Sequence, residues 1–191
     1  MRGQIRDAAL RLFGSNGYFI TSIHDIQREA GISIGSIYNH FGGKKGIAKA
    51  LYHDLLAQME DLVDEVTATS DSAYGRGLAV VERLFLMTEQ DSLSMRFILN
   101  VKHREFLPDE PPICSARPFV KLRDIVNQGM LGGENRDLDT WVAAACTFAP
   151  ALRLITLRLD GALPDSPDGY AQSVWDSAWR AVRNGTGGDR A

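Results

Sequence analysis

Apolar side chains recur every three or four residues along most of the chain, as they do on the buried face of an α-helix. In the first such segment they are Ile5, Ala8, Ala9, Leu12 and Phe13. No segment alternates apolar and polar residues with the period of two that a half-buried strand requires. The pattern therefore predicts an all-α fold that begins with a helix over about residues 3–15.

The next segment combines two short helices with a tight turn. Ser22 and Asp25 resemble a capping box, which predicts a helix from about residue 22 to residue 30. Gly31 tolerates the positive φ that ends many helices, and the hydroxyl of Ser33 can cap a second helix through about His40. The sequence thus predicts helix, turn, helix.

A longer apolar stripe begins after Gly42 and Gly43 and predicts one helix over 44–67, about 35 Å long. The same period predicts further helices over about 72–89, 92–104, 117–131, 137–160 and 167–183. Four of the seven prolines lie between residues 105 and 118, which predicts a loop there. Pro150 is expected to kink the helix that contains it.

Charge is distributed unevenly between the two ends of the chain. Residues 1–53 hold seven Lys or Arg and three acidic residues, a net charge of +4, whereas the other residues hold 14 and 21. A small basic module favours a polyanionic partner. We therefore expect four parts, namely a basic module over 1–43, a connecting helix over 44–67, a helical body over 68–184 and a disordered tail over 185–191.

Composition excludes several classes of protein. The 191 residues are 45% apolar and 24% charged, which excludes a disordered chain and a collagen. Cys114 and Cys146 are too few for a disulfide framework and lack the spacing of zinc ligands. Thr147 and Pro150 interrupt the most apolar stretch, so no membrane span is expected, and the N-terminus shows no export signal. We expect a cytoplasmic protein.

The most informative stretch runs from Thr21 to Phe41. A helix-turn-helix needs apolar residues that hold its two helices together, and isoleucines at helical spacing supply them here. One face of the second helix is left free for DNA. The side chains on that face are short, flat or hydrogen-bonding, so they can approach phosphates and base edges. They are Ser33, Gly35, Ser36, Tyr38, Asn39 and His40.

The pattern Gly-Tyr…Thr-Ser-x-x-Asp-Ile…Ala-Gly-Ile-Ser-x-Gly-x-x-Tyr-x-His-Phe-x-x-Lys resembles the DNA-binding module of TetR-family transcriptional regulators over residues 5–51. The resemblance implies that residues 33–40 form the recognition helix. It also implies phosphate contacts by Tyr38, His40 and Lys44, and backbone contacts from the helix before. The predicted DNA-binding residues are Thr21, Ser22, Ser33, Gly35, Ser36, Tyr38, Asn39, His40 and Lys44.

Two positions depart from the family pattern, and some alternatives stay open. Gln27 replaces a small Ala, and Lys45-Gly46 replaces the usual Glu-x. Tyr38 is alternatively a half-buried core aromatic, and His40 a solvated residue at a helix end. The whole module is alternatively a unit that docks to another protein, since helix-turn-helix geometry also occurs outside DNA binding.

No catalytic arrangement is visible in the sequence. The four histidines lack the spacing of a metal-binding pair, and Gly132-Gly133 lacks the Lys-Ser/Thr of a phosphate-binding loop. Cys146 lies in an apolar setting that indicates a buried, inert thiol. We expect no enzymatic activity, no catalytic residue, no metal and no cofactor.

The body is rich in Met and aromatic residues, most of which must be core. Such residues also line pockets for apolar ligands, and the resembling family holds an effector pocket in its helical body. The predicted ligand residues are Phe85, Met95, Phe97, His103, Phe106, Phe119, Trp141 and Phe148. For each of them a core position is the alternative. His103 and Arg104, just before the proline-rich loop, are candidate polar anchors at the mouth of such a pocket, and a solvated surface position is the alternative for both.

The helix predicted over 167–183 carries an aromatic stripe that a small body would not leave in water. A homodimer would cover it, with Trp175 and Trp179 in the interface, and would place two recognition helices on a palindromic operator. We therefore expect a ligand-responsive repressor that a small hydrophobic effector releases from double-stranded DNA. The alternatives are an activator or DNA organiser without effector, and, from another class, a helical enzyme or docking module.

Overall fold

The computed structural model describes residues 1–185 and confirms the predicted all-α fold, with no β-strand among these residues. Three short 3-10 helices, η1 (His103–Glu105), η2 (Ile113–Ser115) and η3 (Pro167–Tyr170), join the longer elements. Apart from Gly185, the predicted disordered tail lies outside the described residues. The α-helices are α1 (Arg2–Asn16), α2 (Ile23–Ala30), α3 (Ile34–Phe41), α4 (Lys44–Thr67), α5 (Ala73–Gln90), α6 (Ser92–Asn100), α7 (Arg117–Leu131), α8 (Thr140–Leu159) and α9 (Ala171–Arg180).

Helix ends differ from the predicted ones where caps and turns intervene. The helix predicted over 92–104 stops at Asn100 because the backbone becomes extended at Val101, and η1 follows. The helix predicted over 137–160 starts at Thr140, because the Asp139 carboxylate accepts hydrogen bonds from the amides of Trp141 and Val142. The helix predicted over 167–183 is divided into η3 and α9.

The chain folds into two compact units that do not follow the order of the sequence. Unit 1 contains Met1–Gln58 and Asp91–Ile113, and unit 2 contains Met59–Gln90 and the chain from Cys114 onward. Helix α4 begins in unit 1 and ends in unit 2. The functional division expected from the sequence remains a prediction, but α6 and the loop after it pack with the N-terminal helices.

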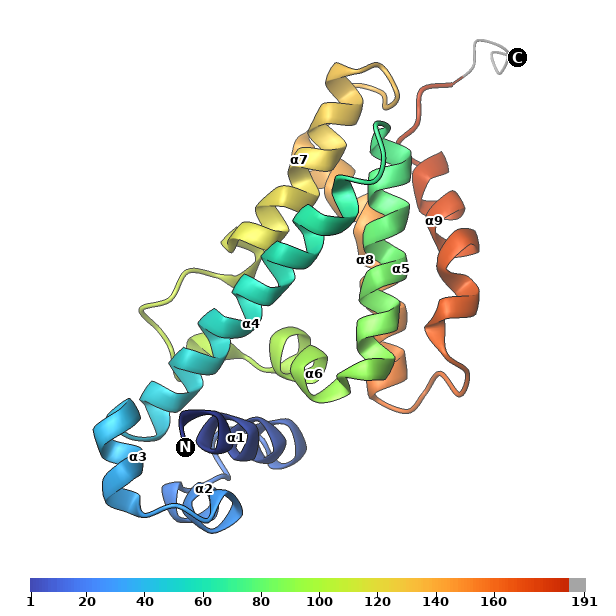
Figure 1. The fold of residues 1–191 in the computed structure, drawn as a ribbon. Helices are drawn as coiled ribbons and strands as arrows, with labels where there is room; N and C mark the ends of the chain where they lie inside the picture. The colour runs from blue at the N-terminus through green and yellow to red at the C-terminus, as the bar shows by residue number, and fades with distance from the viewer. Residues whose placement is uncertain (186–191) are drawn as a thin grey trace. The chain divides into compact units, whose positions relative to one another are not determined.

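Unit 1 is built around α1, which packs against both α2 and α6 (Figure 1). Phe13 of α1 stacks on Phe97 of α6 with ring centroids 6.2 Å apart. Ile26 of α2 and Ile37 of α3 are fully buried, as the helix-turn-helix pattern requires. The apolar stripe predicted from the sequence therefore fixes α2 and α3 against the rest of the unit.

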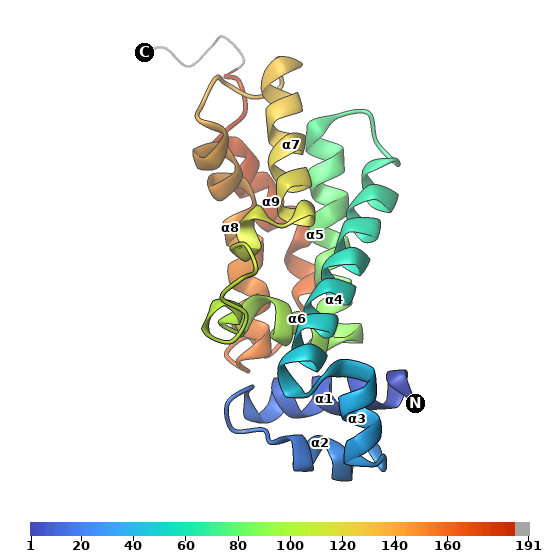
Figure 2. The ribbon, with the colours of Figure 1, turned by 90° about the vertical axis from the view of Figure 1, so that its left-hand side faces the viewer.

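Unit 2 is a bundle in which α5, α7, α8 and α9 pack against one another (Figure 2). Its centre is Trp175, whose ring centroid lies 5.4 Å from that of Phe148, 5.6 Å from that of Trp179 and 6.2 Å from that of Tyr74. The Glu134 carboxylate, from the loop after α7, accepts hydrogen bonds from the first two amides of α5. Aromatic packing and this cap hold the bundle together.

Helix α8 is long and apolar enough to cross a membrane by length and composition, despite the interruptions at Thr147 and Pro150. The helix continues through Pro150 and packs against α7 and α9. Core helices of soluble proteins satisfy the same criterion, and a third of the apolar window of α8 is buried.

Candidate functional site

The helix-turn-helix is fixed by local hydrogen bonds that its sequence encodes. The Ser22 hydroxyl accepts a bond from the Asp25 amide at 3.1 Å, and the Asp25 carboxylate accepts one from the Ser22 amide at 2.9 Å. Hydrogen bonds from Ser22 and from Arg28 lower the pKa of Asp25 to about 2. Gly31 ends α2 at a φ of 65°, and the Ser33 hydroxyl then caps α3 by accepting the Ser36 amide at 3.2 Å.

Helix α3 presents a polar face to solvent. Tyr38 is 53% exposed, and its ring also lies next to Gly43. A side chain added at Gly35 would meet nothing within 4 Å, which leaves room for a close approach by another molecule. The exposed residues of this face are Ser33, Gly35, Tyr38, Asn39 and His40, and Ser36 is partly exposed.

Thr21 does not belong to this exposed set, and its predicted DNA contact is wrong for the side chain. Thr21 is 2% exposed, and its hydroxyl donates to the carbonyl oxygens of Gly17 at 2.9 Å and Leu12 at 3.2 Å. The hydroxyl therefore closes the loop between α1 and α2. A buried hydroxyl needs such a partner, and the sequence could not show that the partner is internal.

Lys44 also turns inward instead of toward a phosphate. Its ammonium donates to the carbonyl oxygens of Thr21 at 2.8 Å and Tyr18 at 2.9 Å, and it lies 4.2 Å from the Tyr18 ring centroid. Burial lowers the pKa of Lys44. The predicted phosphate contact is thus replaced by a brace between the start of α4 and the α1–α2 loop.

We predict that Lys44→Met lowers the free energy of unfolding by about 1–2 kcal/mol, because two carbonyl oxygens lose a charged donor. Methionine keeps the apolar stem against Tyr18. Urea denaturation measures the loss, and Lys102→Met, at an exposed position outside the module, is the control. Equal stability of the two variants would show that the hydrogen bonds of Lys44 do not stabilise the folded protein.

The lysines and arginines of residues 1–53 all have partners within unit 1. Lys44 is engaged as described, and Arg2 lies 4.9 Å from the Phe41 ring centroid. Asp54, Asp109 and Glu110 lie outside residues 1–53, so they offset most of the positive charge counted there. The ion pairs are Arg6–Asp54 (3.0 Å), Arg11–Glu29 (2.9 Å), Arg28–Asp25, Lys45–Asp109 (3.6 Å) and Lys49–Glu110 (2.8 Å).

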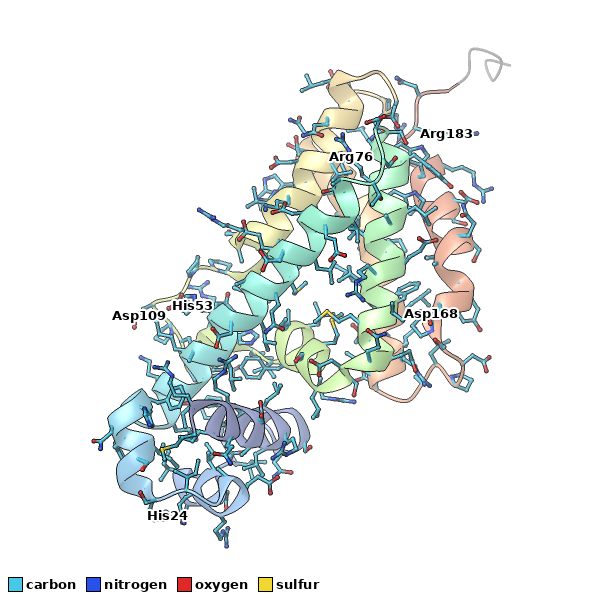
Figure 3. All side chains as sticks on the ribbon, in the orientation of Figure 1. His24, His53, Arg76, Asp109, Asp168 and Arg183 are labelled. Atoms are coloured by element: carbon cyan, nitrogen blue, oxygen red, sulfur yellow. The ribbon has the colours of Figure 1, made fainter. Side chains whose placement is uncertain are left out.

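The loop after α6 is held to α4 by a row of basic side chains that were not singled out from the sequence. Lys45, Lys49 and His53 recur every four residues on α4, and the imidazole Nε2 of His53 lies 3.2 Å from the Glu110 carboxylate. Figure 3 shows His53 and Asp109 on neighbouring segments. The hydrogen bond from Lys49 lowers the pKa of Glu110. The spacing of these three basic residues was the available signal in the sequence.

The structure also explains one departure from the family pattern. A Cβ at Gly46 would lie 1.6 Å from the carbonyl oxygen of Phe41, so only glycine fits where α3 ends and α4 begins. Lys45 pairs with Asp109. Gln27 is partly buried, and its backbone carbonyl oxygen accepts a hydrogen bond from the Ile32 amide at 3.3 Å. Nothing in the structure explains the side chain at Gln27.

Comparison with known proteins agrees with this arrangement. Residues 5–51 match the family described as bacterial regulatory proteins, tetR family. The HTH-type transcriptional regulator TtgR of Pseudomonas putida is 32% identical over 184 residues, which cover 87% of this chain and 83% of TtgR. The chain belongs to the TetR family. This TetR-family chain is a DNA-binding transcriptional regulator.

Further relatives extend the resemblance to the whole fold. The fatty acid metabolism regulator protein of Bacillus subtilis is 26% identical over 165 residues, covering 80% of each chain. The crystal structure of FadR from Bacillus subtilis in complex with stearoyl-CoA has a TM-score of 0.81 and 20% identity, and covers 96% of this chain and 100% of that one. At that identity the structural likeness shows the fold.

The predicted ligand residues of the regulator are separated by the structure. Phe85 is core in unit 2, whereas Met95, Phe97, His103 and Phe106 are buried in unit 1. The other three come together in a groove of about 180 Å³ between α7 and α8, which we call the α7–α8 groove. Its lining residues are Cys114, Phe119, Leu122, Arg123, Trp141, Ala144, Ala145, Phe148, Ala149 and Leu152.

A second hollow of about 330 Å³ lies within unit 2, between the end of α4, α5 and α7. Its rim is charged. Lys121 donates to both oxygens of Asp64 at 2.6 Å, and Arg76 donates to the carbonyl oxygen of Ser70 at 2.8 Å. This hollow lies beside the connecting helix, and its lining mixes Val63, Ala68 and Ile125 with charged side chains.

His103 lines neither hollow, and the solvated position considered for it is wrong. It is 6% exposed, and its ring centroid lies 4.7 Å from that of Tyr52, 5.0 Å from that of Phe97 and 5.8 Å from that of Phe106. Burial lowers the pKa of His103 to about 4, and a hydrogen bond with the Phe97 backbone opposes part of this effect. The imidazole is therefore neutral at pH 7.

We predict that His103 makes the protein less stable as the pH falls from 6.5 toward 4. In this window the unfolded chain binds a proton at His103 and the folded chain does not, so protonation favours unfolding by up to about 1.4 kcal/mol for each pH unit. Unfolding free energies of the wild type and of His103→Phe, measured by urea denaturation across this range, should diverge at the lower pH. Parallel curves would contradict the prediction.

The predicted dimer residues are already covered within the chain. Trp175 is 1% exposed and Trp179 is 8% exposed, so the aromatic stripe of α9 faces the bundle instead of a second subunit. Helix α8 also leaves apolar residues in water, since Trp141 is 55% exposed and Val142 and Cys146 are exposed as well. The expected buried thiol at Cys146 is therefore wrong, because this residue points away from the core.

The described residues contain no group of three or more His, Cys, Asp or Glu side chains that could hold a metal ion.

Sequence reasoning also missed Arg123, whose guanidinium lies 4.0 Å from the ring centroid of Trp141. A lone arginine on a predicted helix carries no signal in the sequence. Its position became visible only when α7 and α8 were brought together.

Proposed function

We propose that this regulator is a cytoplasmic repressor without enzymatic activity, which binds a palindromic operator as a homodimer and leaves it when a small hydrophobic effector binds. The observation that carries the proposal is the exposed polar face of α3, on a helix-turn-helix whose apolar residues are buried. In this arrangement Asn39 and Ser36 face base edges. Tyr38, His40 and Ser22 approach phosphates.

The exposed face of α8 supports the homodimer. Val142, Cys146, Ala149 and Arg153 follow one another at helical spacing, and all are exposed. A two-fold axis through this face would pair α8 with its copy and bury the small apolar side chains. Half-sites one DNA turn apart, or a multiple of about 34–36 Å, would follow from the symmetry.

The α7–α8 groove supports a hydrophobic effector. Phe119, Trp141 and Phe148 line it together with three alanines of α8. The structure of FadR, which shares the fold, contains stearoyl-CoA. We place the effector of this regulator in the groove.

Helix α7 offers a route from the groove to DNA. On one side it lines the groove, and on the other Lys121 pairs with Asp64 at 2.6 Å and with Glu60 at 3.0 Å, both on α4. Helix α4 runs without a break to Lys44, next to the recognition helix. An effector that shifts α7 would move α4, and a coupling of about 1–3 kcal/mol would lower operator affinity roughly 5- to 150-fold.

The test begins with the DNA that the purified protein retains from a genomic pool. A palindromic sequence should be enriched, and fluorescence anisotropy should show that Asn39→Ala relaxes base preference. The matched control is Asn127→Ala, an exposed asparagine on α7. Failure to enrich any sequence would favour the docking module, and a monomer of about 21 kDa in sedimentation would remove the homodimer.

The coupling is tested on the same operator. Hydrophobic compounds that stabilise the protein thermally should weaken operator binding, and operator should weaken their binding by the same factor. Lys121→Met should reduce this factor while leaving compound binding unchanged, because it breaks two of the ion pairs between α7 and α4 and leaves Arg117–Glu60. A compound that binds tightly with and without operator would contradict the coupling for that compound.

A further inference from the structure

The α7–α8 groove contains a single charge. Arg123 is the one charged residue among the ten that line the groove, and none of them is an aspartate or a glutamate. The neighbouring Asp124 lines the other hollow, on the opposite side of α7. The groove thus combines an apolar floor with one uncompensated cation, an arrangement that attracts an anion more strongly than a neutral molecule.

The geometry of Arg123 prepares it to bind an anion. Its guanidinium stacks 4.0 Å from the Trp141 ring centroid, and one terminal nitrogen donates to the carbonyl oxygen of Cys114 at 2.6 Å. A guanidinium has five N–H donors in one plane, and within the described part of the chain the structure gives Arg123 this one hydrogen bond. Stacking and the single bond orient the plane, so that its edge can pair with both oxygens of a carboxylate.

We propose that the groove binds an anionic amphiphile, with a carboxylate or a comparable anionic group on Arg123 and a hydrocarbon chain along Phe119, Phe148 and Leu152. The inference rests on the proposed function in placing the effector in this groove, and it adds the effector's charge. A chain on the apolar floor gains by leaving water. An alcohol would forgo the charge-assisted pair, and a cationic amphiphile would be repelled.

The groove largely differs in its residues from the face assigned to a second subunit. Of that face only Ala149 lines the groove, at its edge, whereas Val142, Cys146 and Arg153 do not. A second copy of this chain would have to supply an anion opposite Arg123, and the exposed α8 face carries a further cation, Arg153, instead of a carboxylate. Charge complementarity therefore favours a small anion as the occupant.

The experiment compares three probes with the same chain and different heads, namely octanoate, octanol and octyltrimethylammonium, each below the concentration at which it aggregates. Calorimetric titration of the full chain should give octanoate about tenfold tighter binding than octanol and still weaker binding of the ammonium probe. Arg123→Gln should abolish the difference between octanoate and octanol. Arg123→Lys should restore part of it.

Two further variants locate the effect. Ala145→Leu fills the groove at an exposed position and should weaken binding of octanoate and octanol alike. Arg153→Gln removes a cation from α8 outside the groove and should leave the preference for octanoate unchanged. Thermal melting shows that each variant folds. Equal binding of octanoate and octanol, or a preference that survives Arg123→Gln, would overturn the proposal.

Operator binding and oligomeric state are measured separately, so that this inference and the proposed function can fail independently. If octanoate binds through Arg123 and operator affinity does not change, the effector switch fails and the anion site stands. If neutral compounds release operator and Arg123→Gln has no effect on any probe, the switch stands and the anion site is wrong. Dissociation of dimers by octanoate would assign the groove to the subunit interface and overturn the proposal.

Discussion

Gly46→Ala is expected to disrupt the junction between α3 and α4 and to weaken operator binding by roughly 100-fold or more. The added Cβ would lie 1.6 Å from the carbonyl oxygen of Phe41 and 2.8 Å from its carbonyl carbon. Both atoms belong to the backbone, so no side-chain rotation relieves the clash. The end of α3 must move, at a cost of about 3 kcal/mol or more, and the recognition surface moves with it.

The control for this prediction is Gly3→Ala, in the first turn of α1. A Cβ there meets nothing within 4 Å, so alanine should raise the free energy of unfolding by about 0.5–1 kcal/mol. Urea denaturation and operator anisotropy are measured on both variants. Wild-type stability and affinity in Gly46→Ala would show that the junction tolerates a side chain.

Gly77→Ala should produce the largest loss of stability in unit 2, about 3 kcal/mol. Its Cβ would lie 2.1 Å from Cη2 and 2.2 Å from Cζ2 of Trp175. The indole has no space to retreat, because Trp175 is buried against Phe148 and Trp179. Overpacking at such a position forces a shift of α5 or of α9.

A double variant isolates the clash. Trp175→Phe removes the two ring atoms nearest to residue 77 and destabilises the protein by itself. Combined with Gly77→Ala, it should cost clearly less than the sum of the two single changes, because alanine then occupies space that the indole has left. Gly169→Ala, in η3, is the control, since its Cβ meets nothing within 4 Å. Additive losses would contradict a direct contact.

The helix-turn-helix could be predicted because its signals are local. Ser22 reaches Asp25 three residues away, Ser33 reaches Ser36 over the same distance, and Gly31 adopts its positive φ without help from other elements. Interactions of this range depend on residue types that the sequence displays directly. The all-α fold followed from periodicity in the same way.

Predictions failed where a side chain finds its partner far along the chain. Lys44 donates to carbonyl oxygens 23 and 26 residues earlier, which no pattern near Lys44 announces. Trp175 is covered by aromatic residues of α5 and α8, so an aromatic stripe by itself did not distinguish a core from an interface. Three of the predicted ligand residues do meet in one groove, but the cation beside them became visible only in three dimensions.

The division of the chain into units limits how this regulator can exchange parts with its relatives. Unit 1 is discontinuous, because residues 91–113 complete it after the chain has already passed through α5. A chimera joined at residue 43 or at residue 67 would separate α1 from α6 and leave Phe13 without Phe97. Exchange of the DNA-binding part, in evolution or in the laboratory, therefore requires three crossovers. One lies within α4, and the other two lie on either side of α6 and its loop.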